Sequence, residues 1–166
     1  MDNLTPLAAE LGATLKAKNK MLALAESCTG GLASAAVTEI PGSSAWFERG
    51  FVTYSNESKI EMLGVSAKTL EKFGAVSEET AREMVLGALK HSHANVAISI
   101  TGIAGPDGGT PQKPIGTVCF AWVCFDKAFT YKIASATKKI SGNRRQIRHL
   151  SVETAFSELL KLLTTN

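Results

Sequence analysis

The chain has 166 residues, of which 45% are apolar and 20% are charged, a composition typical of one globular domain and not of a disordered chain. The net charge is only +3, no apolar run approaches the roughly 20 residues that cross a bilayer, and no secretory signal is visible at the N-terminus. Three cysteines without a CxxC spacing make neither a disulfide framework nor a zinc site, so we expect a soluble protein of a reducing compartment without membrane contact.

The first third of the chain predicts two helices and two strands. The apolar run 21–25 has the character of a short buried strand, and a helix of small residues follows from about Leu32 to Ile40. Residues 41–44 predict a turn, and residues 46–54 a second strand. Before these elements, five apolar residues at helical spacing predict the first helix: Leu4, Leu7, Ala8, Leu11 and Leu15.

Two further helices and a strand are predicted in the middle of the chain. Asn56 is the expected cap of a short helix that contains Lys59, and Ser77 is the expected cap of a longer one. Residues 96–101 form another apolar strand. The buried stripe of the helix that follows Ser77 consists of Ala81, Met84, Val85, Ala88 and Leu89.

A long loop, a hairpin and a final helix complete the chain. Residues 102–114 are rich in glycine and proline, and a connection longer than about 12 residues is usually functional. Residues 115–125 predict a strand, which a tight turn at Asp126-Lys127 joins to a second strand with Phe129, Tyr131 and Ile133 on one side. The last helix begins near Asn143. Its apolar face consists of Val152, Ala155, Phe156, Leu159, Leu160 and Leu163.

Helices and strands alternate early and a hairpin comes late, which predicts an α/β protein. We expect a three-layer α/β/α sandwich with a mixed central sheet, formed by residues 1–166 as a single domain. Cys119 and Cys124 lie an odd number of positions apart on one predicted strand, so they are expected to face opposite sides of the sheet in the core.

The positive charge is concentrated in one segment. Residues 127–148 contain seven basic residues and no Asp or Glu. Most of these are expected on a solvated surface, with one or two in contact with an anionic ligand. Few aromatic residues lie among them, which argues against a nucleic-acid surface. The seven are Lys127, Lys132, Lys138, Lys139, Arg144, Arg145 and Arg148.

Two loops are placed where open α/β sheets bind ligands, beyond the carboxyl ends of strands. One follows Ala25 and contains Ser27; the other follows Ile100 and contains Thr101. Ser27 precedes a Gly-Gly helix start, so its hydroxyl is either a nucleophile beside free backbone N–H groups or an ordinary N-cap. Cys28 is an alternative nucleophile, because a helix N-terminus lowers the pKa of a thiol.

A serine nucleophile needs a base, and histidine is poorly placed to serve as one. His91, His93 and His149 all lie on predicted helices, and the His-x-His pair lacks a third metal ligand. Lysine is the other option, since burial lowers its pKa. Lys59 follows a strand end and can return to the sheet edge, although a surface position is the more common one for a lysine.

Several motifs together resemble the CinA C-terminal domain family, the nicotinamide-nucleotide amidases, in its standalone form. They occur in the same order over nearly the whole chain. The matching runs are residues 25–31, 50–56 with Lys59, 63–65, 74–77, 101–106, 109–110 and 114–118.

The resemblance implies hydrolysis of the carboxamide of nicotinamide mononucleotide, in cytoplasmic pyridine-nucleotide salvage, without metal or cofactor and in a homodimer or larger assembly. It implies Ser27 as nucleophile, Lys59 as its base and Tyr54 as a hydrogen-bonding assistant. Arg144 matches the family's arginine, although Asn143 replaces the usual Asp before it and Arg145 competes for the role. A non-catalytic nucleotide-binding module is the alternative. The residues assigned to substrate binding are Cys28, Thr29, Gly30, Gly31, Thr101, Gly102, Gly105 and Arg144.

Overall fold

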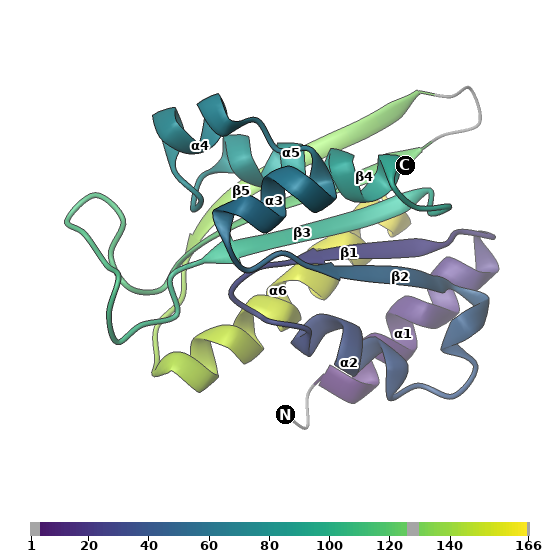
Figure 1. The fold of residues 1–166 in the computed structure, drawn as a ribbon. Coiled ribbons are helices and arrows are strands. Elements are labelled where there is room, and N and C mark those ends of the chain that lie inside the picture. The colour runs from purple at the N-terminus through teal and green to yellow at the C-terminus, as the bar shows by residue number, and fades with distance from the viewer. Residues whose placement is uncertain (1–3, 126–129, 166) are drawn as a thin grey trace.

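A mixed sheet of five strands runs through the middle of the molecule (Figure 1). The computed structural model describes residues 4–125 and 130–165. The strands are β1 (Leu22–Glu26), β2 (Phe47–Val52), β3 (Val96–Gly102), β4 (Thr117–Phe125) and β5 (Tyr131–Lys139). They lie in the order β2-β1-β3-β4-β5; the first three are mutually parallel, and β4 runs antiparallel to both β3 and β5.

Helices cover both faces of this sheet, as Figure 1 shows. One face carries α1 (Leu4–Ala17), α2 (Leu32–Thr38) and α6 (Arg144–Thr164), and the other carries α3 (Asn56–Leu63), α4 (Ala67–Phe73) and α5 (Glu78–Lys90). Each layer has its own apolar core, centred on residues such as Phe156 on the first face and Met84 on the second. Each large side chain buried this way contributes about 1.5–3 kcal/mol. The predicted three-layer α/β/α sandwich is confirmed.

The element predictions agree with the structure apart from two differences on one face. The expected cap Asn56 is the first residue of α3, and Ser55 is the cap, because its hydroxyl accepts from the N–H of Ser58 at 3.0 Å. Helix α4 was not predicted, since only Leu70 of its seven residues is buried and its apolar pattern is weak. The predicted turn at 41–44 leads into a short 3-10 helix, η1 (Ser43–Ala45).

The hairpin and the last helix follow the prediction closely. β4 and β5 pair antiparallel, with Phe125 opposite Tyr131. The predicted turn at Asp126-Lys127 and the position of Phe129 lie outside the described residues. Asn143 caps α6 through a capping box with Gln146. Cys119 and Cys124 belong to the cores on opposite faces, as expected. Over residues 4–125 and 130–165, no helix has both the length and the apolar character to cross a membrane.

The register of the parallel strands determines where polar side chains converge. Glu26, the last residue of β1, pairs with Val52 of β2 on one side and with Ile100 of β3 on the other. The carboxyl ends of three strands are therefore level at one edge of the sheet. Ligands of open α/β sheets bind at this edge, since loops and helix N-termini meet there.

Candidate active site

A tight turn after β1 presents Ser27 at the sheet edge. The carboxylate of Glu26, which is fully buried, holds this turn from behind. It accepts hydrogen bonds from the hydroxyls of Thr29 and Ser34, both at 2.7 Å, and from the N–H groups of Gly31, Ala33 and Ser34. Helix α2 has no side-chain cap at Gly31, so Glu26 supplies the acceptor that an N-cap residue ordinarily provides.

Backbone hydrogen bonds fix the position of Ser27 itself. Its N–H donates to the carbonyl of Ile100 on β3 at 2.9 Å, and its carbonyl accepts from the N–H of Gly30 at 3.1 Å. Within residues 4–125 and 130–165, the N–H groups of Cys28 and Thr29 donate to no protein acceptor. The turn therefore leaves two backbone donors beside the serine, which is the arrangement that stabilises an oxyanion.

Helix α3 brings Lys59 back to this serine. The Nζ atom of Lys59 lies 2.8 Å from the hydroxyl oxygen of Ser27, 2.8 Å from the carbonyl oxygen of Thr53 and 3.2 Å from that of Tyr54. The side chain of Lys59 is only 1% exposed, and Ser27 is 7% exposed. A neutral amine has two N–H bonds and one lone pair. The two carbonyls can accept both N–H bonds, which leaves the lone pair directed at the Ser27 hydroxyl.

Burial determines the protonation of Lys59. Removal of the ammonium group from water lowers the pKa of Lys59 to about 8 and outweighs an opposing contribution from Cys28. About a tenth of the protein molecules therefore carry Lys59 as an uncharged amine at pH 7, far more than for a lysine in water. A group of this pKa can accept a proton from an alcohol and return it to a departing amine.

Cys28 lacks the properties of a reactive thiol. Burial raises its pKa to about 11, and this outweighs the lowering by the nearby N–H of the same residue and by Arg148. The predicted lowering by a helix N-terminus is therefore wrong, because desolvation of the thiolate dominates. His149 lies on α6, while His91 caps the C-terminus of α5 and His93 follows in the loop. None of the three lines the cavity at Ser27.

A cavity of about 290 Å³ opens in front of the Ser27–Lys59 pair. Eight of the eleven residues predicted for the site line it together, from five separate parts of the chain. Thr29, Gly30 and Gly31 do not line it and instead form the turn behind the serine. The eight lining residues are Ser27, Cys28, Tyr54, Lys59, Thr101, Gly102, Gly105 and Arg144.

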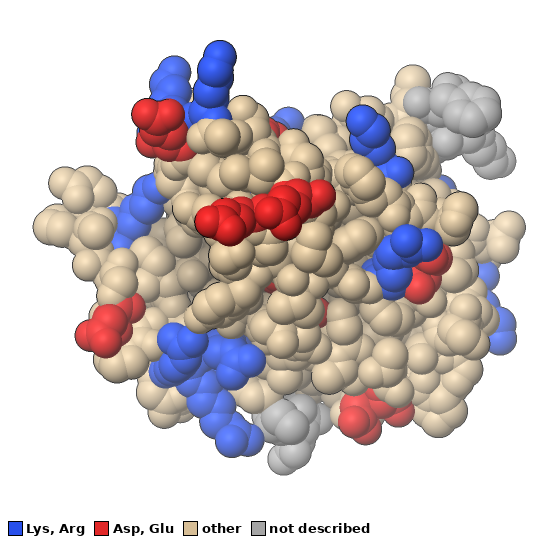
Figure 2. Space-filling model, viewed as in Figure 1, with Lys and Arg blue, Asp and Glu red and all other residues tan. Residues whose placement is uncertain are grey.

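Tyr54 and Arg144 stand at the mouth of the cavity. The guanidinium of Arg144 donates to the carbonyl of Gly105 at 2.8 Å and to the hydroxyl of Tyr54 at 3.3 Å, and the ring of Tyr54 is 63% exposed. Basic side chains gather near the start of α6 on the face that Figure 2 shows. Arg145, the competing residue, does not line the cavity. Lys127 of the basic segment lies outside the described residues.

Another wall of the cavity is formed by β3 and the loop that follows it. The hydroxyl of Thr101 donates to the carbonyl of Ala75 at 2.9 Å, which ties β3 to the segment before α5. Gly102 and Gly105 permit close packing of this wall. A Cβ atom on Gly102 would lie 2.8 Å from Val118, and one on Gly105, where φ is +79°, would lie 2.6 Å from Ile115.

Two residues of the site were not predicted individually. Glu26 is a carboxylate at the end of an apolar run, and a buried charge there requires several donors. Arg148 belongs to the basic segment expected on the surface, yet it donates to the carbonyls of Cys28 and Thr29. The signal was its spacing, since Arg148 follows Arg144 by four positions and so lies on the same face of α6.

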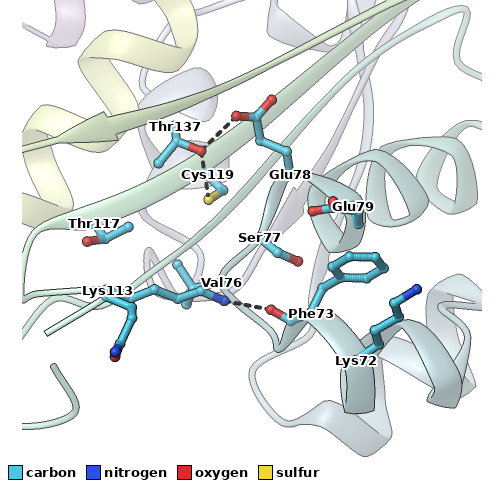
Figure 3. A pocket seen from close by; sticks show the side chains of 11 residues that line it. Lys72, Phe73, Val76, Ser77, Glu78, Glu79, Lys113, Thr117, Cys119 and Thr137 are labelled. Atoms are coloured by element: carbon cyan, nitrogen blue, oxygen red, sulfur yellow. Dashed lines mark hydrogen bonds between the residues drawn. The ribbon is translucent and has the colours of Figure 1, made fainter. Parts of the chain in front are cut away.

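A second, larger cavity lies on the other side of the segment before α5. Its volume is about 680 Å³, and Val76 lines both cavities. Figure 3 shows two hydrogen bonds of its polar side chains: Glu78 accepts from Thr137 at 2.8 Å, and Lys113 donates to the backbone carbonyl of Phe73 at 2.6 Å. In the part of the chain that is described, no group of three or more His, Cys, Asp or Glu side chains could hold a metal ion.

The fold and the site define a three-layer α/β protein whose cavity pairs a serine hydroxyl with a desolvated lysine amine. The chain belongs to the CinA C-terminal domain family, whose model matches residues 4–163. It is 51% identical over 159 residues to the nicotinamide-nucleotide amidohydrolase PncC of Enterobacter agglomerans, covering 93% of this chain and 94% of that protein. It is 46% identical to the PncC of Escherichia coli strain K12, covering 98% and 96% respectively.

Solved structures of CinA proteins have the same fold as this chain. The competence/damage inducible protein CihA of Agrobacterium tumefaciens superposes with a TM-score of 0.88 at 43% identity, covering 98% of this chain and 96% of that one. A CinA superfamily protein of Klebsiella pneumoniae superposes with a TM-score of 0.90 at 35% identity, covering 96% and 97%. The resemblance to the family and the predicted fold class are both confirmed.

Proposed function

We propose that this chain is an amidohydrolase that converts nicotinamide mononucleotide to nicotinate mononucleotide and ammonia. The observation that carries the proposal is the 2.8 Å hydrogen bond between a buried Lys59 amine and the Ser27 hydroxyl. The name nicotinamide-nucleotide amidohydrolase, which relatives of 45–51% identity carry, supports the substrate. Amide hydrolysis needs a nucleophile, a proton acceptor that then donates, and an oxyanion site.

The first half of the reaction forms an ester on Ser27. The neutral amine of Lys59 takes the hydroxyl proton while the serine oxygen attacks the carboxamide carbon. The carbonyl oxygen becomes an oxyanion next to the free N–H groups of Cys28 and Thr29. The Lys59 ammonium then donates its proton to the amide nitrogen, the C–N bond breaks and ammonia leaves.

The second half returns the protein to its starting state. Lys59, neutral again, takes a proton from a water molecule that attacks the ester carbon. The tetrahedral intermediate collapses, the C–O bond to Ser27 breaks, and Lys59 returns the proton to the serine oxygen. The carboxylic acid that results passes its proton to solvent, and the product leaves as the nicotinate carboxylate. Lys59 thus serves both halves of the cycle, for which its pKa of about 8 is well suited.

The cavity also has the groups that a nucleotide needs. Arg144 supplies a cation at its mouth, and a guanidinium binds a phosphate through charge-assisted hydrogen bonds. Among the described residues, the N–H groups of Ala104, Gly105 and Gly108 in the same wall have no protein acceptor, and such runs of N–H groups bind anions. Asp107, the acidic residue of the lining, can accept from ribose hydroxyls.

The proposal is tested by measuring ammonia release from nicotinamide mononucleotide together with a binding titration of the same compound. We expect stoichiometric ammonia and nicotinate mononucleotide. Binding without ammonia release would favour the alternative of a non-catalytic nucleotide-binding module. Neither binding nor release would reject this nucleotide as the ligand.

The rate should depend on pH through Lys59. The neutral amine is the active form, so with a pKa of about 8 roughly a tenth of the protein is active at pH 7 and half at pH 8. We expect kcat/KM to rise about tenfold per pH unit below this value and to level off above it. The phosphate of the substrate titrates near pH 6, so the substrate does not change its charge between pH 7 and 9. A pH profile without a limb near pH 8 would remove Lys59 as the base.

Arg144→Ala should weaken substrate binding with little effect on the chemical step. A hydrogen bond to a charged group is worth about 1.5–3 kcal/mol, so KM should rise roughly 10- to 100-fold while kcat stays within about threefold. Nicotinamide riboside, which lacks the phosphate, provides the control, because wild type and Arg144→Ala should then have similar KM values. If Arg145→Ala raised KM and Arg144→Ala did not, the assignment to Arg144 would be wrong.

A further inference from the structure

Arg148 holds the turn that carries Ser27. It projects from the second turn of α6 and is half-buried. Its Nε atom donates to the carbonyl of Cys28 at 3.1 Å, and its NH2 group donates to the carbonyl of Thr29 at 3.0 Å. Arg148 does not line the cavity, so its donors face the protein backbone and not the substrate.

The two carbonyls belong to peptide groups whose N–H ends matter for the reaction. In a trans peptide the C=O and N–H bonds point in opposite directions, so fixing the carbonyl also orients the N–H. The carbonyl of Cys28 shares its peptide group with the N–H of Thr29, which has no acceptor in the described part of the chain. Arg148 therefore orients and polarises that donor directly.

The second contact reaches the other free donor through one intervening hydrogen bond. The carbonyl of Thr29 shares its peptide group with the N–H of Gly30, which donates to the carbonyl of Ser27 at 3.1 Å. The carbonyl of Ser27 in turn shares its peptide group with the N–H of Cys28. Hydrogen bonds in such a chain polarise one another in a low-dielectric interior. This series of hydrogen bonds begins at the guanidinium of Arg148 and ends at the N–H of Cys28, beside the Ser27 hydroxyl.

We infer that Arg148 is a positioning residue that orients and polarises the backbone donors of Cys28 and Thr29 toward the oxyanion, without touching the substrate. The developing negative charge of the tetrahedral intermediate is then stabilised by the guanidinium through peptide groups. The neighbouring Glu26 complements this role. Its carboxylate binds the N–H groups of Gly31, Ala33 and Ser34, which leaves those of Cys28 and Thr29 free for the reaction.

The inference rests on the proposed function, so its test uses two substrates. The first is nicotinamide mononucleotide. The second is p-nitrophenyl acetate, an activated ester that acylates Ser27 with release of p-nitrophenolate and needs the oxyanion donors but no nucleotide binding. Loss of a whole oxyanion donor costs roughly 10²–10³ in rate, so loss of its orientation and polarisation in Arg148→Ala should cost about 10- to 100-fold.

The expected changes in kcat, KM and the pH profile distinguish a positioning role of Arg148 from a structural role and from phosphate binding. In Arg148→Ala we expect kcat to fall 10- to 100-fold and KM to change less than about threefold. The acid limb near pH 8 should stay in place, since the lowered pKa of Lys59 comes mainly from its burial. Guanidinium ion at millimolar concentration should restore part of the rate. Arg145→Ala, a matched arginine on α6 outside the cavity, should behave as wild type.

Arg148→Lys is a second variant in case Arg148→Ala does not fold. Lysine keeps the positive charge, but its ammonium can reach only one of the two carbonyls at a time. This variant should fall between wild type and Arg148→Ala on both substrates. A wild-type kcat for Arg148→Ala on both substrates would overturn the inference, and so would a rise in KM alone or a lack of guanidinium rescue with full folding. If the ester acylates Ser27 in an Arg148-dependent way while the nucleotide is not hydrolysed, the inference stands and the proposed function falls. Failure of both substrates to react with Ser27 in wild type would reject both.

Discussion

Ser27→Ala should abolish ammonia release from nicotinamide mononucleotide while the protein stays folded. The hydroxyl is the atom that forms the ester, so we expect kcat to fall by roughly 10⁴-fold or more, as for other serine nucleophiles. The fold should persist because Ser27 is anchored by its backbone, through bonds to Ile100 and Gly30 that alanine retains. Lys59 keeps its two carbonyl acceptors, so the loss of stability should be about 1 kcal/mol.

Three measurements accompany this variant. Thermal unfolding should place its Tm within a few degrees of wild type, and a titration should give a similar Kd for the nucleotide. Ser43→Ala is the matched control, since Ser43 lies in η1 and does not line the cavity. Ammonia release by Ser27→Ala within tenfold of the wild-type rate would remove Ser27 from the mechanism.

Lys59→Arg should be inactive although it keeps the positive charge. The arginine guanidinium stays protonated at every accessible pH and cannot act as a base near neutral pH. Loss of the base should cost roughly 10³-fold or more in kcat, at the upper end of the range for general acid–base catalysis. If arginine replaced lysine without loss, the group at this position would act through its charge and not through proton transfer.

Lys59→Met separates loss of the base from disruption of the core. Methionine is uncharged and of similar length, which suits a site that is only 1% exposed. We expect it to fold, to bind the nucleotide, and to show a residual rate that no longer rises through pH 8. Lys68→Arg, on the exposed side of α4, is the control and should retain full activity. A residual rate that still titrates near pH 8 would assign that limb to another group.

Most of the fold could be predicted because each element carries its own local signal. The helical spacing of Leu4, Ala8, Leu11 and Leu15 and the capping box at Asn143 do not depend on distant residues. Helix α4 lacked such a signal, because it lies on the surface with one buried residue. The cap of α3 was misassigned by one position, since Ser55 and Asn56 are both good caps and the choice depends on the backbone entering the helix.

The candidate site was harder to predict than the fold, because it depends on contacts between residues far apart in the sequence. The motif around Ser27 was visible, yet a lysine in the position of Lys59 is ordinarily a surface residue. Its burial depends on α3 packing against the sheet edge, so that Nζ meets Ser27, 32 positions away. Arg148 lies 120 positions from Cys28. The alternative nucleophile Cys28 lacks the lowered pKa that it needs for the same reason, because desolvation by the surrounding chain raises that pKa.

The sequence by itself determined the α/β class, the order of the elements and the loops that carry polar residues, because hydrophobic periodicity and turn chemistry are local properties of the chain. The tertiary structure alone decided which side chains meet, which of them lose their water, and hence which groups hold or release a proton. A pKa or the direction of a backbone N–H depends on every neighbour within a few ångströms. In this protein those neighbours come from strand ends and helices far apart along the chain.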